Sequence, residues 1–238
     1  MIDLHCHLLP YVDDGAHDLE EAEKLLALEA EQGVTALCVT AHLREEMFET
    51  PDELLRKQYE RLKPMAAAKG LTLHLSREYH WDGQTLEKLQ AGEVLPIGNH
   101  VMLTEFSSAH SAEQIFRAAG EIREYGYIPL IAHAERCPAI GPEQAAALRD
   151  EGALIQVNAD AVLGFDGRYT KKLAWLLLKS GAVDVIASDA HDTALRPPRM
   201  KECFARIAKK LGRETAERLM RTNPARILGE RSRGTENE

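Results

Sequence analysis

The sequence predicts an α/β fold in which seven parallel strands form a closed or nearly closed barrel. Seven short, β-like apolar segments alternate along the chain with longer segments whose apolar residues recur at helical spacing. Histidine or acidic residues repeatedly stand at the ends of the strand-like segments, where an α/β barrel places its chemistry. An open doubly wound sheet is the alternative. No glycine-rich phosphate-binding loop follows the first strand, so a nucleotide-binding fold has no specific support.

Length and composition limit the class of protein. The 238 residues fit one large domain, which we expect to span residues 1–230 and to be followed by a polar tail over 231–238. No uncharged apolar stretch is long enough to span a bilayer, and the first strand begins too near the N-terminus to leave room for a signal peptide. We therefore expect a cytoplasmic protein without membrane insertion.

The net charge and the cysteines narrow the class further. A formal charge of −9 argues against a nucleic-acid-binding surface, which needs clustered Lys and Arg to neutralise phosphates. The cysteines lack C-x-x-C spacing, which favours free thiols over a zinc knuckle or a disulfide framework. They are Cys6, Cys38, Cys137 and Cys203. The sequence predicts no particular oligomeric state.

The first strand carries His5 and His7, whose side chains project from the same face because strand residues alternate. Cys6 then points to the opposite face, where we expect it to be packed rather than reactive. Two adjacent imidazoles can begin a transition-metal site, but such ions need four to six ligands. A His-x-His pair alone is more often structural, so the rest of the chain must supply further ligands.

The remaining elements alternate in chain order. Short apolar runs predict strands over residues 34–40, 71–79, 101–106, 128–132, 154–157 and 183–187. Apolar residues at helical spacing predict helices over residues 18–32, 51–69, 84–91, 111–125, 142–151, 171–180 and 198–228. Gly33 suits the end of the first helix, and Pro51 suits the start of the second. We expect Pro64 to kink the second helix or to end it early.

The candidate metal ligands are the polar residues that stand at or near the strand ends. They are His5, His7, Asp14, His42, Glu78, Glu105, His133, Asp189 and His191. Nine ligands exceed the needs of one ion, and shared carboxylates can bridge ions about 3.5–4 Å apart, so we expect a centre of two or three divalent ions. Three such ions and four carboxylates would leave a net charge that suits a dianionic phosphate.

These residues carry a resemblance to a known superfamily. The motifs are His5-Cys6-His7-Leu8-Leu9-Pro10, Asp13-Asp14-Gly15-Ala16, His133-Ala134-Glu135-Arg136 and Ser188-Asp189-Ala190-His191, with His42, Glu78 and Glu105-Phe106 between them. Together they resemble the polymerase-and-histidinol-phosphatase (PHP) superfamily. More narrowly, they resemble the bacterial PHP-type tyrosine phosphatases associated with capsular and extracellular polysaccharide synthesis.

The resemblance implies a distorted seven-stranded (β/α) barrel with a centre of up to three ions, manganese in the first place and iron or zinc otherwise. It implies one ion held by His5, His7, Glu78 and Asp189, a second held by Glu78, Glu105 and His133, and a third held by Asp14, His42 and His191. It also implies that Arg136 and Arg196 bind the phosphate. Guanidinium groups suit that role because they bind phosphoryl oxygens bidentately.

The expected reaction is metal-assisted hydrolysis of a phosphomonoester without a covalent phospho-enzyme. Cys137 does not begin a Cys-x5-Arg loop of the thiol-dependent tyrosine phosphatases, since Glu143 stands where that loop has its arginine. By resemblance, the substrate is a phosphotyrosyl protein, a bacterial tyrosine kinase that controls polysaccharide export. A histidinol phosphatase or another PHP phosphoesterase, such as one acting on a nucleotide, is the first alternative. A non-catalytic PHP module is the second.

Four positions depart from the family pattern without removing a proposed ligand, and they bear on loop shape and substrate preference. They are Ala41, Leu43, Ser76 and Ser107. Four further polar residues lie near the proposed ligands, and we expect them to be solvated loop residues. They are Arg44, His80, His110 and Asp192.

Overall fold

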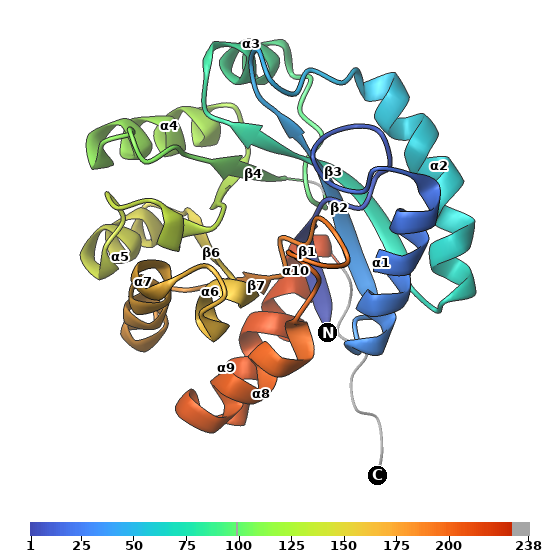
Figure 1. Ribbon diagram of the computed structural model, residues 1–238. Coiled ribbons are helices and arrows are strands. Elements are labelled where there is room, and N and C mark those ends of the chain that lie inside the picture. Colours follow the sequence, from blue (N-terminus) through green and yellow to red (C-terminus); the bar gives the residue numbers. More distant parts are fainter. Residues whose placement is uncertain (99, 230–238) are drawn as a thin grey trace.

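Seven parallel strands form one sheet whose order follows the chain from first to last (Figure 1). The structure, a computed structural model, describes residues 1–98 and 100–229, so the predicted tail over 231–238 lies outside the described residues. The strands are β1 (Ile2–Cys6), β2 (Ala36–Leu43), β3 (Thr72–His80), β4 (Val101–Glu105), β5 (Ile128–Ile131), β6 (Leu154–Asn158) and β7 (Val185–Ala187).

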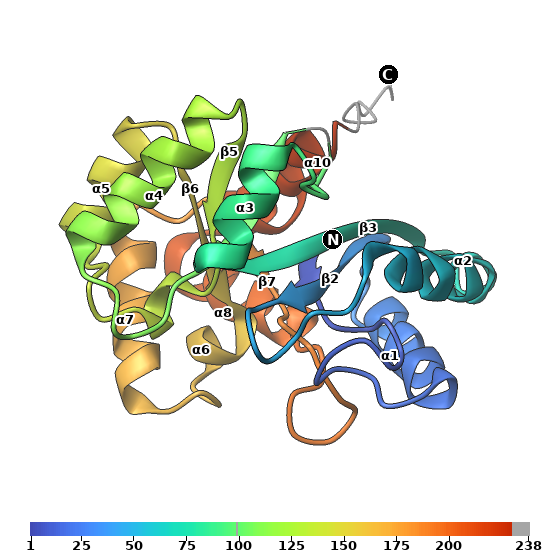
Figure 2. The same ribbon diagram turned by 90° about the horizontal axis from the view of Figure 1, so that it is seen from above.

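Helices connect the successive strands and surround the sheet (Figures 1 and 2). They are α1 (Leu19–Glu31), α2 (Asp52–Ala68), α3 (Gly83–Ala91), α4 (Ala112–Glu124), α5 (Pro142–Asp150), α6 (Ala159–Leu163), α7 (Arg168–Ser180), α8 (Met200–Leu211), α9 (Arg213–Glu217) and α10 (Asn223–Leu228), with the short turns η1 (Ala134–Arg136) and η2 (Arg218–Thr222). No helix in the described part of the chain is both long and apolar enough to cross a bilayer.

The sheet becomes a nearly closed barrel because the ends of β1 and β7 meet. The backbone N–H of Asp189 donates to the carbonyl of His5, and the N–H of His7 donates to the carbonyl of Ala190, both at 2.8 Å. A sequential strand order with its first and last members in contact excludes the open doubly wound sheet, in which the order reverses. The predicted seven-stranded barrel is therefore confirmed.

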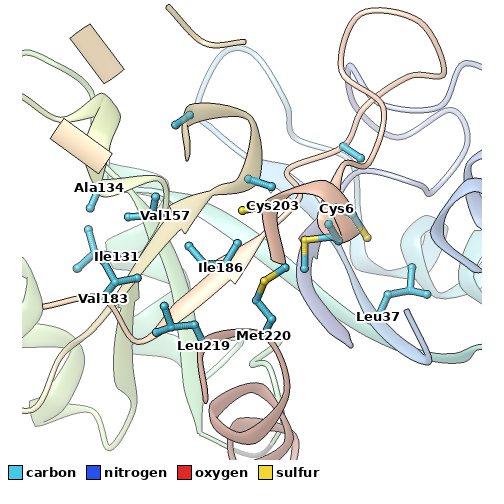
Figure 3. Packing of buried hydrophobic residues seen from close by; sticks show 14 of the residues in the cluster. Cys6, Leu37, Ile131, Ala134, Val157, Val183, Ile186, Cys203, Leu219 and Met220 are labelled. Atoms are coloured by element: carbon cyan, nitrogen blue, oxygen red, sulfur yellow. The ribbon is translucent and has the colours of Figure 1, made fainter. Parts of the chain in front are cut away.

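The two largest of three apolar clusters lie on the two faces of the sheet. The smaller one includes Leu4, Cys38 and Leu103 and is packed by residues of α10, so it fills one end of the barrel. The larger one packs the outer face of the strands against the surrounding helices, and Figure 3 shows its part around Ile186 and Met220. Apolar packing thus occupies one end of the barrel, and polar side chains can occupy the other.

An irregularity in β1 decides which face the first ligands occupy. Ile2 pairs with Ala36 and Cys6 pairs with Val39, so β1 places one residue more than β2 in this interval. Such a bulge reverses the alternation of side chains. Leu4 belongs to the inner cluster, yet His5, the next residue, also faces the inside of the barrel.

Several elements differ in extent from the predicted ones. Strand β2 continues past the predicted end at residue 40, so that His42 lies within it, and α2 continues through Pro64 to Ala68. Pro64 is tolerated because it lies on the exposed side of α2, where water can hydrate the carbonyl that loses its partner. The predicted helix over 198–228 is divided into α8, α9, η2 and α10, and Gly212 marks the first division.

A pair of buried carboxyl groups supports the bulge from the helix side. Asp3 Oδ1 accepts hydrogen bonds from the backbone N–H of His5 (3.2 Å) and of Ser188 (3.0 Å), which joins β1 to the chain after β7. Glu29, from α1, lies against Asp3 and is fully buried. Burial raises the pKa of Glu29 well above its ordinary value, and the neighbouring Asp3 raises it further.

The pH dependence of stability should change when Glu29 is neutralised. Between the unfolded pKa and the raised folded pKa, the folded protein holds a proton that the unfolded chain has released, so wild-type stability falls as pH rises across this window. Glu29→Gln removes this titration and can still donate a hydrogen bond to Asp3. Its stability relative to wild type should rise with pH, by up to about 1.4 kcal/mol per pH unit. Urea unfolding at several pH values measures this.

The matched control is Glu31→Gln, which makes the same change at an exposed position of the same helix. Its stability should follow the wild-type curve. If the stabilities of Glu29→Gln and the wild type changed with pH in parallel, Glu29 would not hold a proton in the folded state.

Candidate metal centre

All nine predicted ligand side chains converge at the carboxyl ends of the strands. The cluster is held together by short contacts around Glu78, which is fully buried. Its Oε2 lies 3.1 Å from His5 Nε2, 3.3 Å from His7 Nε2 and 3.0 Å from His42 Nδ1, and its Oε1 lies 2.9 Å from His133 Nε2. Side chains from β1, β2, β3 and the end of β5 therefore meet at one carboxylate.

The remaining predicted ligands lie around this centre. Asp189 Oδ1 is 3.3 Å from His5 Nε2, and Glu105 Oε2 is 3.6 Å from His133 Nε2. Asp14 Oδ1 is 3.5 Å from both His42 Nε2 and His191 Nε2. Three groups have ligand atoms within 4.8 Å of one another: His5, His7 and Asp189; His42, Glu78 and Glu105; and His7, Asp14, His42 and His191.

Three of the five imidazoles are oriented so that one nitrogen of each is left for an ion. His5 Nδ1 donates to Gln156 Oε1 (3.2 Å), His7 Nδ1 donates to Asp13 Oδ2 (2.9 Å), and His191 Nδ1 donates to the carbonyl of Asp189 (2.9 Å). A histidine whose Nδ1 is bound in this way presents the lone pair of Nε2, which is the usual arrangement of a metal-bound imidazole. The free nitrogens point towards the shared centre.

Several buried polar atoms at this centre lie close together without a hydrogen-bond partner. Among the described residues, Glu78 Oε2, His42 Nδ1 and His191 Nε2 are buried and lack a hydrogen-bond partner. His5 Nε2 and His7 Nε2 lie only 3.1 Å apart. Buried donors and acceptors are normally paired, so a set of unpaired lone pairs aimed at one region fits bound cations. The residues present therefore fit a site for divalent metal ions.

The electrostatics of the cluster favour ionised carboxylates. Burial opposes the charged form of Glu78, but the imidazoles of His5 and His42 outweigh it and hold the pKa of Glu78 well below its usual range. Burial likewise opposes ionisation of Asp189, but His5, His7 and Arg136 together outweigh it and hold the pKa of Asp189 well below its usual range. Burial and the neighbouring His7 lower the pKa of His191 to about 2, so that its imidazole is neutral. Ionised carboxylates and neutral imidazoles are the forms that bind metals. Burial is outweighed by the carboxylates, which raise the pKa of His5 and of His42, so a bound cation would take the place of the protons on these two imidazoles.

The two predicted phosphate-binding arginines lie at the edge of the cluster. Arg136 Nη1 and Arg196 Nη2 donate to the same oxygen, Asp189 Oδ2, at 2.8 and 2.7 Å. Arg136 also donates to Asp166 Oδ2 (3.2 Å). Both guanidinium groups are about one-third exposed, at 33% and 34%, so solvent or a ligand can reach them.

Several residues that were not predicted from the sequence hold the predicted ligands by hydrogen bonds. Asp13, rather than its neighbour Asp14, holds His7, and its carboxylate also accepts from the backbone N–H of His42 (3.0 Å). Gln156 accepts from His5 and donates to Asn158 (2.6 Å), which in turn donates to Asp189 Oδ2 (2.7 Å). The signal was present, since two amide side chains alternate within an otherwise apolar strand, which predicts a polar inner face.

Two residues expected to be solvated have structural partners. His80 is only 9% exposed, and its Nδ1 lies 3.2 Å from Glu105 Oε1, so it orients a predicted ligand. The carboxylate of Asp192 accepts from the backbone N–H groups of the residues that lead to Arg196. The expectation of a solvated loop residue is wrong for His80, which is buried at the end of β3. Asp192 does lie in a partly exposed loop, where its carboxylate fixes the backbone that leads to Arg196.

A cavity of about 440 Å³ lies at the opposite end of the barrel, where the strands begin. It is lined by residues such as Val101, Ile128, Asp184 and Arg226, and it contains none of the predicted ligands. We place the functional site at the carboxyl ends of the strands, because the oriented imidazoles and ionised carboxylates are there.

The barrel and its His/carboxylate cluster define a metal-binding α/β barrel of the PHP type. A family model described as "Capsular polysaccharide synthesis, CpsB/CapC" matches residues 1–229. The chain therefore belongs to the CpsB/CapC family.

Individual relatives agree with this family. The tyrosine-protein phosphatase CpsB of Streptococcus pneumoniae is 34% identical over 238 residues, covering 96% of this chain and 98% of that protein. A solved structure from work on YwqE of Bacillus subtilis and CpsB of S. pneumoniae, described as unique metal-dependent tyrosine phosphatases, superimposes with a TM-score of 0.85 at 26% identity, covering 98% of this chain and 96% of that one. Histidinol phosphate phosphatase of Lactococcus lactis shares the fold, with a TM-score of 0.59 at 12% identity over 92% and 94% of the two chains.

Metal affinity should depend on Asp13 as well as on the ligands. Asp13→Asn keeps the size of the side chain but removes the charge that polarises the imidazole of His7. We expect metal binding to weaken about 10- to 100-fold, which is typical when a carboxylate behind a metal-bound histidine is changed. Competition with a chromophoric chelator measures the affinity.

Asp150→Asn, the same change at an exposed position at the end of α5, is the control and should leave the affinity unaltered. Equal affinities for Asp13→Asn and wild type would show that Asp13 does not support the centre.

Proposed function

We propose that this chain is a metal-dependent phosphomonoester hydrolase that acts as a protein-tyrosine phosphatase, with residues 1–230 as a single phosphatase domain. The observation that carries the proposal is the convergence of nine possible metal ligands with two partly exposed arginines at their edge. A relative with 34% identity and a structural neighbour with a TM-score of 0.85 are named as tyrosine phosphatases, which supports the same activity.

We assign the metal ligands as the resemblance implies. One ion is held by His5, His7, Glu78 and Asp189; a second by Glu78, Glu105 and His133; and a third by Asp14, His42 and His191. Mixed imidazole and carboxylate ligands suit manganese, iron or zinc, and we propose two to three ions with manganese first. When bound, such ions supply Lewis acidity that activates water and offsets the charge of the phosphate.

Arg136 and Arg196 would bind the phosphate of the substrate. Their guanidinium groups converge on one carboxylate oxygen of Asp189, which shows that both can donate to a single anionic group. A phosphoryl group at this edge would accept hydrogen bonds from both, and their charges would stabilise the negative charge on the phosphoryl oxygens.

The thiols of the chain are unsuited to covalent catalysis. All four cysteines are buried and free. Burial raises the pKa of Cys137, the cysteine nearest to the arginine motif, and so disfavours the thiolate that a nucleophile needs. Direct attack by water is the remaining route. A phenol with a pKa of about 10 leaves more easily than an alkoxide, which reduces the need for an acid catalyst.

The physiological substrate that we propose is a phosphotyrosyl protein, a bacterial tyrosine kinase that regulates capsular or extracellular polysaccharide synthesis. Membership of the CpsB/CapC family supports this partner. Because the kinase would present its phosphotyrosine inside the cell, we propose that the phosphatase acts in the cytoplasm.

Substrate preference tests the proposed function. Purified protein loaded with Mn²⁺ is assayed under identical conditions on a phosphotyrosyl peptide, histidinol phosphate and a phosphodiester. We expect kcat/KM to be highest for the peptide. A preference for histidinol phosphate or for the diester would assign the chain to the rival phosphoesterases. No hydrolysis of any of them by metal-loaded protein would indicate a non-catalytic module.

The arginines should affect catalysis without affecting metal binding. Arg136→Ala removes one positively charged donor to the phosphate, so kcat/KM on the phosphotyrosyl peptide should fall by about 100-fold or more. Metal content, measured by elemental analysis, should be unchanged because Arg136 offers no ligand. Arg117→Ala, an exposed position on α4, is the matched control. If Arg136→Ala loses metal together with activity, the side chain holds Asp189 in place and does not bind phosphate.

A further inference from the structure

Large apolar side chains stand exposed on the loops that surround the metal centre. Tyr11 follows β1, Met47 follows β2, Phe165 follows β6 and the short helix α6, and Leu195 follows β7. They are 59%, 57%, 60% and 83% exposed, respectively. Figure 2 shows the loops after β1, β2 and β7 on one side of the molecule and α10 on the other. We call these four side chains the collar.

The first two members of the collar belong to loops that are fixed to the cluster. Asp13, two positions after Tyr11, accepts a hydrogen bond from the backbone N–H of His42 (3.0 Å), so the loop after β1 is joined to β2. Phe48, which follows Met47, stacks on the ring of His42 with centroids 5.1 Å apart. Tyr11 and Met47 are therefore held next to a predicted ligand while their own side chains face solvent.

Phe165 and Leu195, the other two members of the collar, belong to loops that are fixed at the arginines. Asp166, which follows Phe165, pairs with Arg136 (3.2 Å), and Arg196, which follows Leu195, pairs with Asp189 (2.7 Å). Each apolar side chain is thus one position away from a residue fixed in the phosphate-binding part of the site. The guanidinium of Arg199 also lies 4.0 Å above the ring of Phe165, which limits the movement of this ring.

Strained backbone conformations occur at predicted ligands and in the loops that carry the collar. Within residues 1–98 and 100–229, the non-glycine residues with positive φ are His133 (30°), Asp189 (54°), Tyr11 (66°) and Glu46 (62°). Two of these are predicted ligands, and the other two belong to the collar loops. This conformation is unfavourable for bulky side chains and persists where the surrounding structure enforces it, most often at binding sites.

Single exposed apolar side chains are ordinary, but a group around a polar site indicates a binding surface. A small phosphate ester would occupy the ligand cluster and the arginines and would leave the collar in water. A polypeptide would extend beyond them. Beside Met47, a pocket of about 380 Å³ is lined by Glu45, Glu46 and Asp82 together with Arg44 and His80, so negative charge predominates there. Acidic segments are therefore disfavoured and apolar segments favoured.

We propose that the collar binds apolar residues that directly flank the phosphotyrosine of a protein substrate. This inference rests on the proposed phosphatase function and adds the kind of sequence that the site selects. The loops that carry the collar are held by contacts of neighbouring residues, so little backbone entropy is lost when the substrate binds.

The test uses metal-loaded full-length protein and three phosphotyrosyl peptides of equal length, with apolar, glycine/serine or acidic flanking residues. p-Nitrophenyl phosphate, which has no flanking residues, is the reference. Wild-type kcat/KM should be highest for the apolar peptide and lowest for the acidic one. In Leu195→Ser and Met47→Ser, the ratio of kcat/KM on the apolar peptide to that on p-nitrophenyl phosphate should fall about five- to tenfold.

Leu176→Ser is the matched control, since it makes the same change at an exposed position on α7 outside the collar. Its ratio should equal that of the wild type. If the wild type hydrolyses p-nitrophenyl phosphate and all peptides with equal efficiency, or prefers acidic flanks, the collar inference is overturned and the phosphatase function stands. An unchanged ratio in both variants also overturns it. If the wild type hydrolyses none of these substrates, the proposed function itself fails.

Discussion

The buried carboxylate of Glu78 is the constraint on which the rest of the site depends. A carboxylate that is removed from water must be compensated by cations or donors. Glu78 is contacted by four imidazoles, and they come from different parts of the chain. These imidazoles can meet only if β1, β2, β3 and β5 hold their observed order and register. The barrel therefore brings imidazoles that are distant in sequence into contact with the single carboxylate of Glu78.

Closure of the barrel and assembly of the site depend on the same residues. The hydrogen bonds that join the ends of β1 and β7 involve the backbone of His5, His7 and Asp189, which are also three of the predicted ligands. The carboxylate of Asp3 strengthens this seam by accepting from the backbone on both sides of it. A change that loosens the seam would displace ligands of both the first and the last strand, even without touching a ligand side chain.

The sequence sufficed to predict the strand–helix alternation and the polar residues that meet at the strand ends, because both depend on local spacing. Alternation along β1 correctly placed Cys6 opposite His5 and His7, and Cys6 is indeed buried in the outer cluster. The bulge in β1 could not be predicted, since it depends on Ser188, which is distant in sequence. Nor could sequence alone separate Asp13 from Asp14. The turn geometry decides which of two adjacent carboxylates is buried behind His7 and which faces the opening.

In the proposed function, the two oxygens of Asp189 allow Arg136 and Arg196 to bind a phosphate without disrupting the predicted ligands. Oδ1 faces His5 and His7, whereas Oδ2 accepts from Arg136, Arg196 and Asn158. When the arginines turn towards a phosphate, a buried oxygen would lose two donors, which is costly unless another donor remains. Asn158 is that donor, and Gln156 fixes its orientation. The amide pair on β6 would thus keep Asp189 in place when the guanidinium groups exchange its carboxylate for the phosphate of the proposed substrate.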